Sequence, residues 1–143
     1  FLVDAILQDA ANVCEENEIT FHAEAYIPED INLSDIDIVR VFSNLITNSL
    51  EAASIVPESS DRYIEIKSFT NHNWVTTIIT NSFIGELNTQ ENKFKTTKED
   101  KYIHGFGLGI VTDIIEGLGG VIQIDANTKK KIFQVKISAM RKS

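Results

Sequence analysis

A helix that carries two asparagines one turn apart is the feature of this sequence that most constrains its fold. At about 100° per residue, one sector of roughly 80° contains Asp37, Arg40, Asn44, Asn48 and Glu51. The opposite face is apolar or small, with Ile38, Phe42, Leu45, Ile46, Ser49, Leu50, Ala52 and Ala53. Asparagine is a poor helix former, and solvated helix faces usually carry Lys, Glu or Gln instead. A solvated face is the alternative, but the pair is better interpreted as ligands, with the Asn48 carbonyl oxygen suited to Mg²⁺.

A second segment places Gly105, Gly107 and Gly109 at alternate positions, just before an apolar helical pattern over residues 110–118. Glycine lets the backbone approach an anion closely, and the first N–H groups of a helix attract one. A phosphate group suits this site, although glycines also occur at ordinary helix starts. The spacing is not that of a dinucleotide-binding G-x-G-x-x-G, and the chain has no G-x-x-x-x-G-K-[ST] phosphate loop. Together the two segments predict an ATP site.

At these residues the sequence resembles a known family. Residues 44–52 look like the N box, and residues 105–109 like the second glycine box, of the GHKL superfamily of gyrase, heat-shock chaperones, MutL and histidine kinases. The resemblance covers nearly the whole chain and is greatest to the catalytic domains of peptide-pheromone receptor kinases of the AgrC and ComD type. Thr96-Thr97-Lys98, before the glycines, and residues 118–122, after the helix, are also similar.

The resemblance implies a histidine kinase that transfers the γ-phosphoryl group of ATP, with Mg²⁺, to a His on a separate dimerisation helix, in quorum sensing. Asn44, Asn48 and Glu51 are then the catalytic positions, with Asn48 the metal ligand. The nucleotide contacts are expected at Asn81, Lys98, Gly105, Gly107, Leu108 and Gly109. The implied partners are the dimerisation domain, a response regulator and a second copy of the parent kinase. The implied location is the cytoplasmic side of a membrane-bound sensor in a Gram-positive bacterium.

Composition limits the other classes of function. A chain of 143 residues with 43% hydrophobic content suits one domain. A net charge of −8 argues against a nucleic-acid surface. Cys14 is the single cysteine, so no internal disulfide is possible and a reducing compartment is expected. Because the chain begins without Met and with a helical pattern, we expect residues 1–143 to be a catalytic domain whose sensor and dimerisation regions lie upstream.

Periodicity predicts the order of the elements. Helices are expected at 1–16, from a capping pair of Ser34 and Asp37 through the N box, and at 110–118. Strands are expected at 19–27, 62–69, 74–80, 121–126 and 132–139, with a hairpin turn at 71–73. Because helices and strands occur in blocks, we expect an α+β fold: a two-layer α/β sandwich whose mixed, mostly antiparallel sheet is covered on one face by helices. The GHKL resemblance implies the same architecture, the Bergerat fold.

The stretch from about 85 to 104 has almost no apolar periodicity. Loops of this length are uncommon in compact domains and tend to be lids or disordered segments. It lies directly before the glycines and carries four lysines, so we expect an ATP lid in which Lys98 contacts phosphate and Phe94 packs. A surface insertion is the alternative.

The first glycine box departs from the D-x-G-x-G of the superfamily. The aligned residues are Asn81 to Gly85, with Asn81 in place of Asp and Phe83 in place of Gly. An Asn oxygen accepts a bond from the adenine amino group without the strength that charge adds, so weaker nucleotide binding is expected. These departures favour, as the second hypothesis, an interaction domain that has lost productive nucleotide binding.

A further departure concerns the reaction. Hydrolytic relatives begin the N box with Glu, a base for water, whereas Asn44 cannot take up a proton. A hydrolytic ATPase is therefore disfavoured, and phosphoryl transfer, which needs mainly positioning and charge neutralisation, is favoured. The chain contains three histidines, His22, His72 and His104, and none is on a candidate dimerisation helix. The acceptor His is expected in another part of the parent protein.

Overall fold

The computed structural model describes residues 2–85 and 107–143. Helix α1 (Leu2–Glu16) leads into strand β1 (Thr20–Glu24), and the long helix α2 (Asp35–Ser54) follows. A 3-10 turn, η1 (Ser59–Asp61), precedes the hairpin of β2 (Tyr63–Thr70) and β3 (Trp74–Ser82). Helix α5 (Leu108–Gly117) then leads into a second hairpin, β4 (Val121–Asn127) and β5 (Ile132–Met140).

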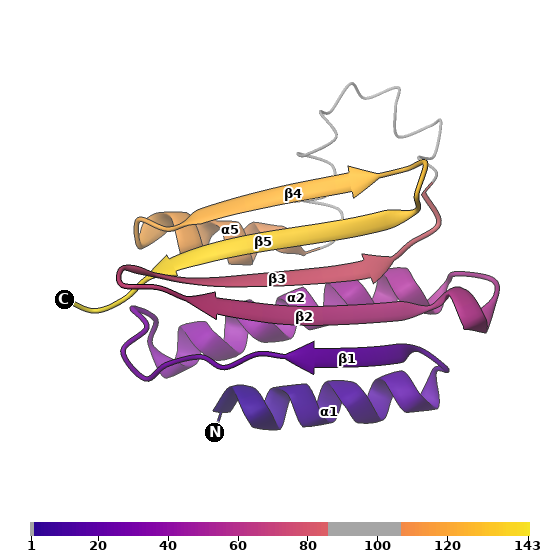
Figure 1. Ribbon diagram of the computed structural model, residues 1–143, viewed down its shortest axis with the longest axis horizontal. Helices are drawn as coiled ribbons and strands as arrows, with labels where there is room; N and C mark the ends of the chain where they lie inside the picture. Colours follow the sequence, from indigo (N-terminus) through magenta and orange to yellow (C-terminus); the bar gives the residue numbers. More distant parts are fainter. Residues whose placement is uncertain (1, 86–106) are drawn as a thin grey trace.

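The five strands form one sheet in the order β1-β2-β3-β5-β4 (Figure 1). The first pair, β1 and β2, is parallel, since α2 lies between them in the chain and carries it back to the same end of the sheet. All other neighbours are antiparallel. The expected mixed, mostly antiparallel sheet is confirmed.

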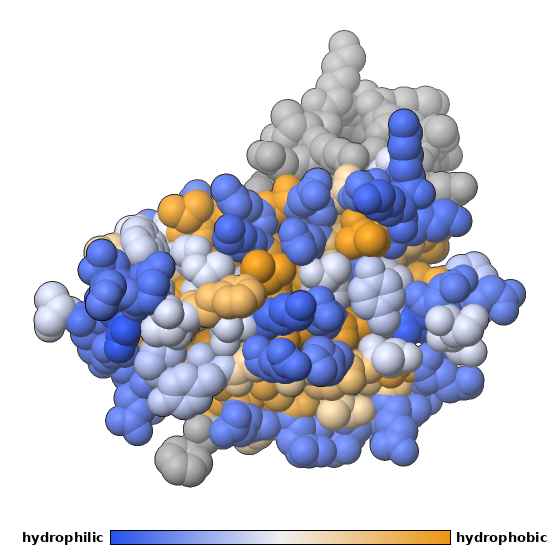
Figure 2. Space-filling view, viewed as in Figure 1, coloured by the Kyte–Doolittle hydropathy of each residue, from blue (hydrophilic) through white to orange (hydrophobic). Residues whose placement is uncertain are grey.

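The helices lie on one face of this sheet, where α2 packs against α1, α5 and β3 (Figure 1). The core between the layers combines the apolar face of α2 with alternate residues of the central strands, such as Ile66, Ile79 and Val135. Polar and apolar residues alternate over the other face, visible in Figure 2. That face carries side-chain hydrogen bonds between neighbouring strands, one between the Thr76 and Ser138 hydroxyls and one from Gln134 to Thr80. Within the described ranges, no helix has the length and apolarity to cross a bilayer.

The expected start of α2 and the turn of the first hairpin are confirmed. Ser34 is the N-cap of α2, and its Oγ accepts a hydrogen bond of 3.2 Å from the backbone N–H of Asp37. In the β2–β3 turn, Asn71 Oδ1 accepts from the backbone N–H groups of Asn73 and Trp74, at 3.0 and 2.8 Å. In both places a short polar side chain satisfies N–H groups that the regular element leaves unpaired.

The elements differ from their expected bounds by up to three residues, and two of the differences have an identifiable cause. The strand expected over 19–27 ends at Glu24. At Tyr26 the backbone groups bond to the Ser68 hydroxyl instead of to the backbone of a neighbouring strand. This hydroxyl accepts from the Tyr26 N–H at 2.8 Å and donates to the Tyr26 carbonyl at 3.0 Å. The third helix begins at Leu108 and not at 110, because Gly107 caps it in the left-handed region at φ 73°.

Candidate nucleotide-binding site

Asn48 is buried in the centre of the molecule. Its side chain is only 2% exposed, and with Ala52, Phe83 and Phe133 it lines a cavity of about 10 Å³. Neither its Oδ1 nor its Nδ2 has a hydrogen-bond partner within the part of the chain that the structure describes. A buried amide without partners destabilises a fold, so its presence is better explained by a ligand than by packing.

Sequence periodicity placed Asn48 in a polar sector, for which a solvated face was the alternative interpretation, and at Asn48 burial contradicts that alternative. Within that sector Arg40 and Glu51 are exposed, while Asp37 and Asn44 are half-buried. Asn48 differs because α2 packs with this side toward Phe83 and Phe133, two residues that the helical pattern alone does not place.

Asn44 lies one turn before Asn48 and meets the start of α5. Its Nδ2 donates to the Arg40 carbonyl at 2.6 Å. Its Oδ1 faces Gly107, where an added Cβ would lie 3.9 Å away. The N box and the glycine-rich helix start, about sixty residues apart in the chain, therefore lie side by side.

The start of α5 offers unpaired backbone donors. Gly107 is its N-cap, and no side chain in the described segments caps the first turn. The Leu108 side chain is fully buried and anchors the helix, while Gly109 is half-buried. The free N–H groups of this turn, with the positive end of the dipole, form a site for an anion such as phosphate.

Asn81 is joined to α2 by a hydrogen bond that the sequence did not predict. It lies at the end of β3 and is 1% exposed. The Ser49 hydroxyl, on α2 and fully buried, donates to Asn81 Oδ1 at 3.0 Å, while Asn81 Nδ2 donates to the Ser82 carbonyl at 2.9 Å. Because a carbonyl can only accept, the Ser82 contact fixes which end of the amide is the NH₂ group. The helical pattern assigned Ser49 to the apolar face. The only sequence feature that could have indicated its role is a hydroxyl next to Asn48 in the chain.

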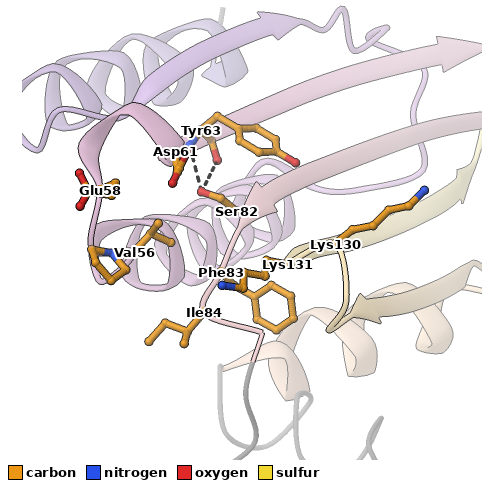
Figure 3. Close-up of a pocket in the computed structure, with 10 residues that line it drawn as sticks. Val56, Glu58, Asp61, Tyr63, Ser82, Phe83, Ile84, Lys130 and Lys131 are labelled. Atoms are coloured by element: carbon orange, nitrogen blue, oxygen red, sulfur yellow. Dashed lines mark hydrogen bonds between the residues drawn. The ribbon is translucent and has the colours of Figure 1, made fainter.

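Phe83, which stands where the superfamily has glycine, is also buried. Its ring packs edge-on against Phe133, with centroids 5.8 Å apart and planes at 63°. It also lines a second cavity of about 540 Å³, which lies beyond the end of α2. Figure 3 shows Val56 of the α2 end, Tyr63 of β2, and Phe83 and Ile84 after β3 around this space. Burial, and secondarily the charge of Glu65, raise the pKa of the Tyr63 phenol, which stays neutral here.

Of the other predicted site residues, the structure describes only Glu51. Glu51 is exposed on α2, about one turn after Asn48. Lys98 and Gly105 lie outside the described residues, as do residues 86–104 of the expected lid, Phe94 and His104. His22 pairs with Glu24 on β1 at 3.0 Å, and His72 lies in the β2–β3 turn.

Gly85 fixes the path of the chain beside this site. Its φ is +81°, and an added Cβ would lie 2.8 Å from the Thr128 carbonyl oxygen and 2.9 Å from Lys131 Cγ. We expect Gly85→Ala to lower the free energy of unfolding by about 2 kcal/mol or more, because both the conformation and the space exclude a side chain. Chemical denaturation measures this. The control is Gly117→Ala in α5, where nothing lies within 4 Å and a gain of up to about 1 kcal/mol is expected. Equal stability of the two variants would contradict the close packing at Gly85.

Comparison with known proteins agrees with this geometry. Among solved structures, the nucleotide-free catalytic domain of the histidine kinase ThkA matches with a TM-score of 0.67 and 21% identity, over 99% of this chain and 94% of that one. The Acinetobacter baumannii histidine kinase AdeS matches with a TM-score of 0.71 and 17% identity, over 99% of this chain and 64% of that one. The mycobacterial sensor histidine kinase MprB matches with a TM-score of 0.67 and 14% identity, over 98% of this chain and 95% of that one.

These matches confirm the fold expected from the sequence, and at such identities they show the fold alone. No curated protein sequence matches the chain. A family model described as the GHKL domain matches residues 33–138, which span α2, both hairpins and the glycine-rich segment. The chain is therefore a member of the GHKL domain family.

Proposed function

We propose that this domain binds ATP with Mg²⁺ and acts as the catalytic domain of a two-component sensor histidine kinase. The observation that carries the proposal is the contact of the asparagine helix with the start of α5, where Asn44 Oδ1 faces Gly107 and no described side chain caps the first turn. A ligand that binds both must offer a hard cation to an amide oxygen and an anion to backbone N–H groups. Magnesium triphosphate offers both.

In this proposal the site residues divide between the metal ion, the phosphates and the adenine. Asn48 Oδ1, which lacks a partner among the described atoms, would hold Mg²⁺. When bound, the ion neutralises phosphate charge. The first N–H groups of α5 bind phosphate oxygens, and Asn81 Oδ1, which has a second lone pair, accepts from the adenine amino group. From the sequence, Gly105 and Lys98 are proposed as further phosphate contacts and Glu51 as a residue that orients a water on the ion.

Asn44 decides between transfer and hydrolysis in this proposal. Its amide cannot take up a proton, and its Nδ2 is already bonded to the Arg40 carbonyl, so it offers no base for an attacking water. We infer transfer to a His on a separate dimerisation helix of the same, homodimeric kinase. A response regulator then receives the group. The similarity to the AgrC and ComD type supports a membrane-bound peptide-pheromone receptor of a Gram-positive bacterium.

The expected result is transfer without hydrolysis. Alone, the domain should neither release phosphate appreciably nor label itself from γ-labelled ATP. Mixed with the His-bearing dimerisation segment of its parent kinase, it should label that segment with an acid-labile, alkali-stable phosphate. The same segment with its acceptor His replaced by Gln is the control. Rapid phosphate release by the domain alone, lost in Asn48→Ala, would favour a hydrolytic ATPase instead.

A regulatory domain without productive nucleotide binding is the second candidate. The observation that favours it is the burial of Asn48, which is 2% exposed and shares with Phe83 and Phe133 a cavity too small for a ligand. Titration with fluorescent ATP, with and without Mg²⁺, separates the two candidates. Binding that requires Mg²⁺ supports the kinase, and no binding in either condition supports the regulatory domain.

A further inference from the structure

Asn48 is buried beside a space that is too small to admit a ligand. The cavity that it lines, of about 10 Å³, is at or below the limit for a single water molecule. The amide therefore meets neither solvent nor a protein partner within the described residues. Burial without partners is unfavourable for an amide. A complex in which Asn48 binds a nucleotide-bound ion would require more space beside its side chain.

Phe83 lies between this small space and a much larger one. Of the described residues, it alone lines both the small cavity at Asn48 and the cavity of about 540 Å³ on its other side. The larger volume falls in the range of cavities that hold a whole small molecule, so an aromatic ring fits there. Phe133 lines the small cavity and not the large one, although it packs against Phe83.

The backbone around Phe83 is held on both sides. The Phe83 N–H donates to the Lys131 carbonyl at 3.1 Å. Two residues later, Gly85 lies in the left-handed region and packs closely against the Thr128 carbonyl. With the main chain fixed at these two places, rotation about the side-chain torsions is the movement left to Phe83.

We propose that Phe83 is a gate that controls access of the nucleotide to Asn48. In the closed form its ring lies beside Asn48 at the small cavity, as in this structure. In the open form the ring lies in the 540 Å³ cavity and leaves the space between Asn48, Ala52 and Phe133 to the nucleotide. Opening also gives the Asn48 amide access to a ligand, which offsets part of the loss of the Phe83–Phe133 contact. The inference rests on the proposed function, since the nucleotide is the ligand that it admits.

The gate lowers the apparent affinity by the fraction of molecules that are open. A minor open state of this kind is typically populated at about 0.1–10%. Removal of the gating side chain should therefore tighten binding by roughly tenfold to a thousandfold. The test compares Phe83→Ala with the matched control Phe133→Ala, which truncates the other ring of the same contact. Magnesium with a fluorescent ATP analogue is the probe, and thermal melting identifies variants that remain folded. Should Phe83→Ala fail to fold, Phe83→Leu replaces it, with Phe133→Leu as its control.

We expect the Phe83 variant to bind at least about tenfold more tightly than the parent, while the Phe133 variant binds no more tightly than the parent. A parent that binds no nucleotide, with a Phe83 variant that does, supports the gate equally. Tight binding by the parent that the Phe83 variant does not improve overturns the gate and leaves the proposed function intact. No binding by the parent or by either variant overturns both.

Discussion

Asn48→Ala is expected to abolish Mg²⁺-dependent nucleotide binding and, at the same time, to stabilise the fold. Loss of the proposed metal ligand should weaken MgATP binding by about a hundredfold or more, since even outer-sphere partners of a metal are worth about 10–100-fold. Removal of an amide that is buried without partners should raise the free energy of unfolding by about 1 kcal/mol, after the cost of the enlarged cavity. For a domain of this length that corresponds to roughly 2–4 °C in Tm.

Asn44→Ala is the matched control for stability. It is the same substitution one turn earlier in α2, so the gain in helix propensity is shared. Asn44 Nδ2 already has a partner in the Arg40 carbonyl, and its removal relieves no unpaired buried group. Titration calorimetry and thermal melting measure the two effects. An Asn48 variant that is less stable than the Asn44 variant would mean that the Asn48 amide has partners in the native state.

The fold was predictable because its signals are local. Ser34 followed by Asp37 marks a helix start wherever it occurs before an apolar pattern, and Asn71 marks the turn of a hairpin. Alternation of buried and less buried residues in β2, β3 and β5 needs only a sheet with one covered face. The start of α5 was predicted two residues late, since helical periodicity does not reveal a cap whose conformation depends on Gly107.

The interior of the site was not predictable, because it depends on contacts between distant residues. Helical angles alone assign Asn48 to a polar sector, and nothing local reveals that it is buried beside a cavity shared with Phe83 and Phe133. The hydrogen bond from Ser49 to Asn81 joins residues 32 positions apart. Substitution of Asp by Asn at position 81 therefore looked like a simple loss of charge. In the structure the Asn81 amide also donates a hydrogen bond to the Ser82 carbonyl, which a carboxylate could not do.

That hydrogen bond leads to the second large expected effect, from Asn81→Asp. The substitution restores the superfamily residue, yet we expect it to destabilise this chain near neutral pH. The introduced carboxylate, 1% exposed, would point one oxygen at the Ser82 carbonyl, where the Asn81 Nδ2 now donates at 2.9 Å. Two acceptors at that distance repel each other, and burial adds to the penalty for the charge. Only the protonated acid reproduces the present contacts, with its O–H donating to Ser82 and its carbonyl accepting from Ser49.

The pH dependence of the stability of this variant distinguishes the effect of the buried charge from a steric effect of the substitution. The introduced acid should have a pKa above the unfolded value of about 3.9, because its neutral form is the one that fits. Near or below that pH, both states bind the proton and the variant should match the parent. As the pH rises above it, the unfolded state loses the proton first. The variant then loses about 1.4 kcal/mol per pH unit relative to the parent, until the native group also ionises.

At pH 7 the deficit should reach roughly 2 kcal/mol or more, measured by denaturant unfolding of parent and variant at each pH. Asn73→Asp, the same change at an exposed position of the β2–β3 turn, is the control and should show almost no deficit at any pH. A pH-independent difference from the parent would mean that the Asn81 amide does not donate to Ser82. The superfamily Asp would then fit this site, and the choice of Asn would concern the nucleotide alone.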